Sequence, residues 1–231
     1  DVMEAGRERV KEQFKIQVTA DNHEVINRSD IVILSVKPQF YAEVIAEIKD
    51  DVREDQIIIT IAPGKTLAWL KEQFGKNVKI VRTMPNTPAL VGEAVTAICP
   101  NANITDGEKQ EIVELIASFG LAQIVSEKIM DAVIAVSGSS PAYVFMFIEA
   151  MADAAVAEGM PRAQAYKFAA QAVLGSAKMV LETGKHPGEL KDMVCSPAGT
   201  TIEAVRVLEE KGFRSSVTEA MKPCEEISKS M

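Results

Sequence analysis

Hydrophobic and polar positions follow different patterns in the two halves of the chain. In the first half, three short β-branched runs, at 30–36, 56–62 and 78–84, contain no polar alternation. Such runs are typical of strands in a parallel sheet that is covered on both faces. Segments with helical spacing, at 38–50 and 65–75, separate them. The order strand, helix, strand, helix, strand predicts an α/β fold.

A further strand at 93–100, a helix at 105–119 and a strand at 121–126 complete this half. We expect an open, doubly wound, Rossmann-like sheet that binds a dinucleotide. Such a sheet normally begins with a strand and a G-x-G-x-x-G turn, and the sequence contains no such glycine run. The first strand, first helix and second strand are therefore expected upstream of Asp1.

From residue 126 onward the strand signals stop and the patterns are helical. Two long helices are predicted, at 141–160 and 161–184, each with a proline at its first position. We therefore expect an incomplete dinucleotide-binding domain over 1–126 and an all-α domain over 127–231. The long helices are rich in alanine, which permits close helix packing. Composition leaves open whether this surface is buried within one chain or against a second subunit.

Composition narrows the class of partner. The chain has 231 residues and a formal net charge of -8, so it offers no basic surface for nucleic acid or an anionic membrane. Its apolar stretch at 142–157 is shorter than the about 20 residues that span a bilayer. Three separated cysteines indicate neither a disulfide framework nor a metal site and favour a reducing, cytoplasmic location.

Three loops carry the candidate nucleotide chemistry. They are SVKPQ at 35–39, APGKT at 62–66 and MPNTPALVG at 84–92, each directly after a predicted parallel strand. Open α/β sheets bind ligands at the carboxyl edge of their strands, so these loops predict the rim of a nucleotide cleft. Ordinary turn chemistry explains any one of them equally well. The two histidines lie in polar contexts and suggest neither a catalytic triad nor a metal centre.

The segment SPAGTTIEAVRVLEEKG, at 196–212, raises a second possibility. Small and hydroxyl residues precede a helix whose first N–H groups are unpaired and whose dipole is positive there. Such a helix start binds anions. The alternative is an ordinary N-cap made by Thr200 or Ser196 with help from Glu203, and the segment alone does not decide between them.

Three long motifs together resemble the pyrroline-5-carboxylate reductase family: VRTMPNTPALVGEAVTAI, AVSGSSPAYVFMFIEAMADAAVAEGM and SPAGTTIEAVRVLEEKGFR. The resemblance covers essentially the whole chain. It implies an NAD(P)-binding sheet, followed by a helical domain that intertwines with a partner subunit, with dimers building a larger ring. It also implies reduction of a cyclic imine to L-proline with NADPH, or with NADH, as the last step of proline biosynthesis. The family places its G-x-G-x-x-G turn before the position of Asp1.

The resemblance also implies roles for individual residues. Those along the cofactor are Asn22, Ser35, Val36, Lys37, Pro38, Ala62, Gly64, Met84 and Asn86, with Asn22 on the adenosine side. Ser196 and the backbone of Gly199 and Thr200 would hold the substrate carboxylate, and Thr201 would contact the ring nitrogen as the catalytic residue. The residues expected to wall the substrate pocket are Val136, Ser137 and Gly138.

The chain departs from the family pattern at Pro63, Ser140 and Ala198, where the family favours alanine, glycine and glycine. A positive φ at Ala198 would cost about 1 kcal/mol. A β-hydroxyacid dehydrogenase is a rival enzyme class, but it needs a lysine in the linker helix, and here only Lys128 is near. A non-catalytic NADP sensor is the other rival, and substrate-dependent cofactor oxidation distinguishes it from an enzyme.

Overall fold

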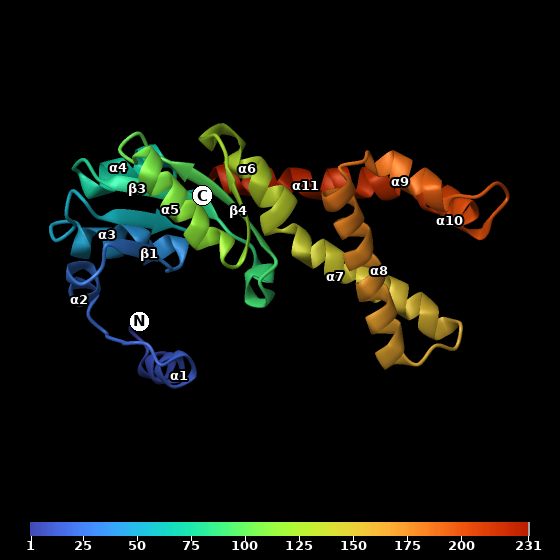
Figure 1. The fold of residues 1–231 in the computed structure, drawn as a ribbon, viewed down its shortest axis with the longest axis horizontal. Helices are drawn as coiled ribbons and strands as arrows, with labels where there is room; N and C mark the ends of the chain where they lie inside the picture. Colours follow the sequence, from blue (N-terminus) through green and yellow to red (C-terminus); the bar gives the residue numbers. More distant parts are fainter. Residues whose placement is uncertain (231) are drawn as a thin grey trace. The chain divides into compact units, whose positions relative to one another are not determined.

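The computed structural model describes residues 1–230 and divides them into two compact units. The first contains residues 1–138 together with the residues from Glu225 onward, and the second contains Ser139–Cys224. The first unit holds all five strands of the sheet, whereas the second is built from helices (Figure 1).

The sheet lies in the first unit and follows the chain in strand order. Its strands are β1 (Ile31–Leu34), β2 (Ile57–Thr60), β3 (Lys79–Met84), β4 (Ala94–Pro100) and β5 (Gly120–Ile124). β1, β2 and β3 are parallel, as the sequence predicts. β4 runs antiparallel to β3 and pairs in parallel with β5, so the sheet is mixed. The link from β3 to β4 is too short for the crossover of a dozen or more residues that a parallel pair needs.

Helices cover both faces of this sheet. Ile58 of β2 packs in a cluster with Ile45 and Leu70 from the helices on one face. Its neighbours Ile57 and Ile59 pack with Ile112 on the other face. Because adjacent side chains of a strand point to opposite faces, a strand buried on both sides carries no polar alternation. This burial explains the apolar runs in the sequence and confirms the doubly wound, Rossmann-like fold class.

The helices of the first unit include the three that the sequence predicts, at 38–50, 65–75 and 105–119, with slightly shorter bounds. Their bounds are α1 (Glu4–Phe14), α2 (Asn22–Asn27), η1 (Pro38–Phe40), α3 (Tyr41–Ile48), α4 (Leu67–Phe74), η2 (Thr87–Val91), α5 (Asp106–Ala117), η3 (Glu127–Ile129), α6 (Met130–Val133) and the π-helical turn η4 (Ile134–Gly138). The sequence pattern did not predict α2, a short helix that Asp21 caps by accepting a hydrogen bond from His23 N at 2.9 Å. Six residues are too few to show helical periodicity.

The second unit contains α7 (Ser140–Ala157), α8 (Arg162–Thr183), α9 (Pro187–Val194), α10 (Thr200–Glu210) and the larger part of α11 (Phe213–Ser230). α7 and α8 pack against each other (Figure 1). The prediction of a proline at the first position of each is wrong in detail. Pro141 is the second residue of α7, and Pro161 is the N-cap of α8.

Among residues 1–230, one helical stretch is long and apolar enough to cross a membrane by length and composition, the 31 residues Glu127–Ala157. The expectation that the apolar stretch is too short does not hold for this longer run. Only 17% of its apolar window is buried. Most of its side chains are therefore left without a covering surface within the described residues.

Candidate active site

The three predicted nucleotide loops leave neighbouring strands at one edge of the sheet. The register pairs Leu34 of β1 with Thr60 of β2, and Thr60 with Arg82 of β3. Because the three strands are parallel and adjacent, the loops that follow them emerge side by side. The structure thus brings together the residues that the sequence nominated for the cofactor at 35–38, 62–64 and 84–86.

The first two loops differ in exposure. Ser35, Val36 and Lys37 are exposed, and Pro38 opens the short helix η1. In the second loop Ala62 is buried, and Gly64 has a φ of +74°, a conformation that favours glycine. The loop ends where Thr66 caps α4. The side chains of the first loop and the backbone at Gly64 are therefore accessible at this edge.

In the third loop, both polar atoms of the Asn86 side chain are hydrogen-bonded within the protein. Its Oδ1 accepts a hydrogen bond from Val95 N at 3.0 Å, and its Nδ2 donates one to the carbonyl of Ser137 at 3.1 Å. Asn86 therefore anchors the loop to the start of β4 and to the π-helical turn. Its amide shapes the site through the backbone around it.

The π-helical turn Ile134–Gly138 supports the same loop from the other side. Ser137 is buried, and its hydroxyl donates to the carbonyl of Val133 at 2.9 Å. A Cβ added to Gly138 would lie 3.1 Å from Cε of Met84. Val136 is exposed. Single π-helical turns occur frequently at functional sites, and here the turn brings Gly138 against Met84.

Asn22, nominated for the adenosine side, is the first residue of α2 and is half-buried. Its Nδ2 donates to Oε2 of Glu47 on α3 at 2.9 Å. The next residue, His23, pairs with Asp51, and the hydrogen bond that its ring donates to this carboxylate raises the His23 pKa. Two side-chain contacts thus hold α2 against α3 and against the turn that follows α3.

Sequence reasoning missed an ion pair between a buried arginine and a half-buried glutamate beneath this edge. Arg82 of β3 is 3% exposed, and its Nη1 donates to Oε1 of Glu127 at 3.1 Å. The same oxygen accepts from the backbone N–H of Leu67, the first residue of α4, at 2.7 Å. One carboxylate therefore ties β3 to the start of α4. The available signal was Arg82, one of two charged residues in the predicted strand 78–84.

In the second unit, α10 begins without a side-chain cap. Its N-cap is Gly199, and no side chain accepts from its first turn. Glu203 accepts from Nε of Arg206 at 2.9 Å instead of turning back toward the helix start. The ordinary N-cap by Thr200 or Ser196 is therefore absent. Unpaired N–H groups and the helix dipole remain at this end, which is the arrangement that attracts an anion.

The turn before α10 admits little variation. Gly199 N donates to the carbonyl of Ser196 at 3.0 Å, and a Cβ at Gly199 would lie 2.3 Å from Oγ of Ser196. Any larger residue would displace that hydroxyl. Ala198 has a φ of +54°, as the departure from the family glycine led us to consider. Thr201 is half-buried in the first turn.

A mixed sheet with nucleotide-type loops at its carboxyl edge, followed by a helical unit with an uncapped helix start, defines a two-part protein of the dinucleotide-binding class. Two family models match the chain in the same order. Residues 2–64 match "NADP oxidoreductase coenzyme F420-dependent", and residues 127–231 match "Pyrroline-5-carboxylate reductase dimerisation".

Similarity to individual known proteins identifies the family. A pyrroline-5-carboxylate reductase of Escherichia coli (strain K12) is 56% identical over 220 residues, which are 95% of this chain and 82% of that protein. The solved pyrroline-5-carboxylate reductase of Coxiella burnetii has a TM-score of 0.91 at 33% identity and covers 100% of this chain and 86% of its own. The Plasmodium falciparum pyrroline carboxylate reductase with NADP bound has a TM-score of 0.86 at 34% identity, covering 92% and 80%. The chain belongs to the pyrroline-5-carboxylate reductase family.

Proposed function

We propose that the protein reduces the cyclic imine L-1-pyrroline-5-carboxylate to L-proline, the last step of proline biosynthesis, with NADPH or NADH. Membership of the family and the NADP in the related Plasmodium falciparum structure support this activity and this cofactor class. When bound, the nicotinamide cofactor supplies the hydride to the imine carbon. The protein binds and orients the two reactants and holds a proton donor near the ring nitrogen.

The residues at the sheet edge fit the dinucleotide. Exposed Ser35, Val36 and Lys37, with Pro38, line one side, and the backbone at the partly exposed Gly64 and the buried Ala62 lines the other. Met84 and the loop anchored by Asn86 stand at the nicotinamide end, where Val136, Ser137 and Gly138 wall the substrate side. Asn22 serves the adenosine side from α2.

The start of α10 carries the substrate assignment. Its N–H groups have no side-chain partner, so a carboxylate there gains about 0.3–2 kcal/mol from the helix dipole. Ser196, Gly199 and Thr200 hold the substrate carboxylate, and Thr201 hydrogen-bonds the ring nitrogen. A Thr hydroxyl is a weak acid at neutral pH, so Thr201 orients a protonated imine or relays a proton from water.

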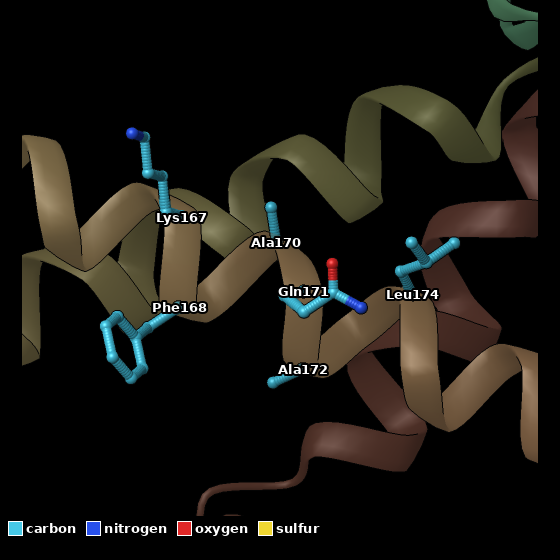
Figure 2. Close-up of a pocket in the computed structure, with 6 residues that line it drawn as sticks. All are labelled: Lys167, Phe168, Ala170, Gln171, Ala172 and Leu174. Carbon is cyan, nitrogen blue, oxygen red and sulfur yellow. The ribbon is translucent and has the colours of Figure 1, made fainter.

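A second copy of the chain covers the helical unit. Phe145, Met146, Phe168 and Leu181 are each more than 60% exposed, at 62%, 68%, 67% and 77%. A groove of about 740 Å³ is lined by Lys167, Phe168, Ala170, Gln171, Ala172 and Leu174. All six project from one helix, α8, so the groove has one wall (Figure 2). The dimerisation model that matches here supports a partner subunit as the other wall.

We extend this proposal to the organisation of the protein. Residues 1–126 form the dinucleotide-binding domain and 127–231 the substrate and dimerisation domain, a boundary supported by the start of the dimerisation model at residue 127. Intertwined dimers assemble into a larger ring in the cytoplasm, without nucleic acid or membrane as partners. The apolar stretch Glu127–Ala157 is then an interface helix.

The experiment is oxidation of NADPH by the full-length protein with and without pyrroline-5-carboxylate, with Thr201→Ala measured in parallel. Turnover of Thr201→Ala should fall roughly 10–10³-fold, the range for one proton-transfer or charge-stabilising contact. Thr218→Ala is the matched control, because the Thr218 hydroxyl bonds only the carbonyl of Arg214 in its own helix. Wild-type turnover in Thr201→Ala would refute its role, and a folded, NADPH-binding protein without substrate-dependent oxidation would favour the sensor.

A further inference from the structure

Tyr41 joins the ends of two neighbouring strands beneath the proposed cofactor site. It is the first residue of α3 and is 0% exposed. Its hydroxyl donates to the carbonyl of Leu34 at 2.6 Å and accepts from the N–H of Ile61 at 3.3 Å. Leu34 is the last residue of β1, and Ile61 directly follows β2. One buried hydroxyl therefore spans the carboxyl ends of both strands.

Each of these two contacts lies at the root of a loop. The loop 35–38 begins immediately after Leu34, and the loop 62–65 begins immediately after Ile61. The chain leaves β1, passes through the first loop and returns with Tyr41, so the hydrogen bond to Leu34 closes that loop. The bond from Ile61 fixes the start of the second loop to the same atom.

The hydroxyl is suited to both bonds. Burial raises the pKa of Tyr41, and hydrogen bonds from the N–H groups of Ile61 and Ala62 oppose this shift less strongly. The group therefore keeps its proton and donates to Leu34. A tyrosine hydroxyl has one donor and free acceptor lone pairs, so it can serve a carbonyl and an N–H together.

We infer that Tyr41 is a positioning residue of this enzyme, whose hydroxyl sets the spacing of the loops 35–38 and 62–65 for the dinucleotide. The inference rests on the proposed function, which assigns both loops to the cofactor. Tyr41 itself does not touch the cofactor, because its side chain is fully buried below the edge. It acts through the backbone of Leu34 and Ile61.

A purely structural role is the competing explanation, because the ring also packs in the cluster that contains Ile45 and Ile58. The opposite end of β2 offers a matched control. Gln56 is also 0% exposed, and its Nε2 donates to the carbonyls of Ile26 at 2.7 Å and Ser29 at 2.6 Å. It performs the same kind of bridging at the amino edge, away from the loops.

The experiment compares the full-length wild type with Tyr41→Phe and Gln56→Met. Tyr41→Phe keeps the ring, so we expect kcat within about twofold of wild type but a three- to tenfold rise in the KM and Kd for NADPH, about one hydrogen bond of binding energy. Gln56→Met should lower the melting temperature at least as much as Tyr41→Phe does. It should leave the KM and Kd for NADPH unchanged. Hydrogen exchange of the amides at 35–37 and 64–65 should accelerate only in Tyr41→Phe.

The outcomes separate the inference from the proposed function. An unchanged Kd for NADPH and unchanged loop exchange in Tyr41→Phe would overturn the inference, as would an equal change in Gln56→Met. A wild type that binds NADPH but does not oxidise it with pyrroline-5-carboxylate would refute the proposed function, while the Kd and exchange comparison still tests Tyr41. A Tyr41→Phe protein that does not fold would also overturn the inference about Tyr41, because the hydroxyl would then be needed for folding itself.

Discussion

The two units of this chain bury their apolar side chains to very different degrees. In the first unit, large side chains such as Ile45, Ile58 and Ile80 are inaccessible to solvent. In the second unit, the buried apolar residues among those described are Ala152, Ala165, Ala169 and Leu190. A sheet covered on both faces completes its own core, whereas a helical pair of this kind leaves its large side chains for another surface. The burial of large apolar side chains thus distinguishes the first unit, which contains the nucleotide-type loops, from the second unit, which matches the dimerisation model.

Disrupting the apolar face of the second unit, which we propose a partner subunit covers, should have the largest effect on the protein. Phe168→Glu places a charge in the apolar groove on α8, where burial of the aromatic ring would contribute about 1.5–3 kcal/mol. We expect the dimer to dissociate at least 100-fold more readily, with parallel loss of turnover, measured by light scattering after gel filtration. Leu115→Glu, on α5 of the first unit, is the control and should remain dimeric. A dimeric Phe168→Glu protein would contradict the assignment of this face.

Breaking the ion pair under the sheet edge should have the next largest effect. Glu127→Ala leaves Arg82 buried without its partner and removes the acceptor of Leu67 N, so stability should fall by about 3 kcal/mol in urea unfolding. Glu182→Ala removes the exposed pair with Lys178 in the second unit and should cost less than about 1 kcal/mol. Equal losses in the two variants would show that burial does not distinguish these pairs.

A smaller change should come from the turn before α10. Ala198→Gly relieves a positive φ of +54° and should raise the melting temperature by the equivalent of about 1 kcal/mol. Ala204→Gly, in the interior of the same helix, should have the opposite sign and a similar size, because glycine is disfavoured within helices. A loss of stability in Ala198→Gly would mean that this turn is not strained.

The smallest effect concerns acid stability of the first unit. A hydrogen bond from Lys79, followed by the backbone N–H of Thr105, lowers the Glu108 pKa from 4.5 to about 2. Because the folded-state pKa is lowered, this carboxylate stabilises the protein above about pH 4.5, and the contribution is lost as pH falls toward 2. Solvent screening keeps it below about 1 kcal/mol.

The measurement is the melting temperature between pH 5 and 2.5. Glu108→Gln should flatten its dependence on pH, whereas Glu111→Gln, which removes a carboxylate from the same helix without touching Lys79, should leave it as in wild type. If the melting temperature depended on pH equally in both variants, the stabilising contact could not be assigned to Glu108 and Lys79.

Much of this protein can be predicted from its sequence, because the relevant interactions are local or repeat along the chain. Apolar runs without alternation located the three parallel strands, and helical spacing located α3, α4, α7 and α8. The rule that parallel strands end at one edge placed the three loops together. The long motifs alone indicated the family.

Other features depended on contacts between residues far apart in the chain. The engagement of the Asn86 amide by Ser137 and Val95 follows from the path of the π-helical turn, which has no local pattern. The residue types before α10 are compatible with both a capped and an uncapped helix start. Only the structure shows that Glu203 pairs with Arg206 and that the start of α10 has no side-chain cap.

The bridging by Tyr41 is the clearest case. In the sequence, Tyr41 is one apolar position at the start of a helix, and nothing near it marks its hydroxyl. Only the parallel pairing of β1 with β2 brings Leu34 and Ile61 within reach of one oxygen atom. Local pattern therefore determines which elements form, whereas packing determines which polar atoms meet, because a hydrogen bond depends on distances of a few tenths of an ångström that periodicity does not encode.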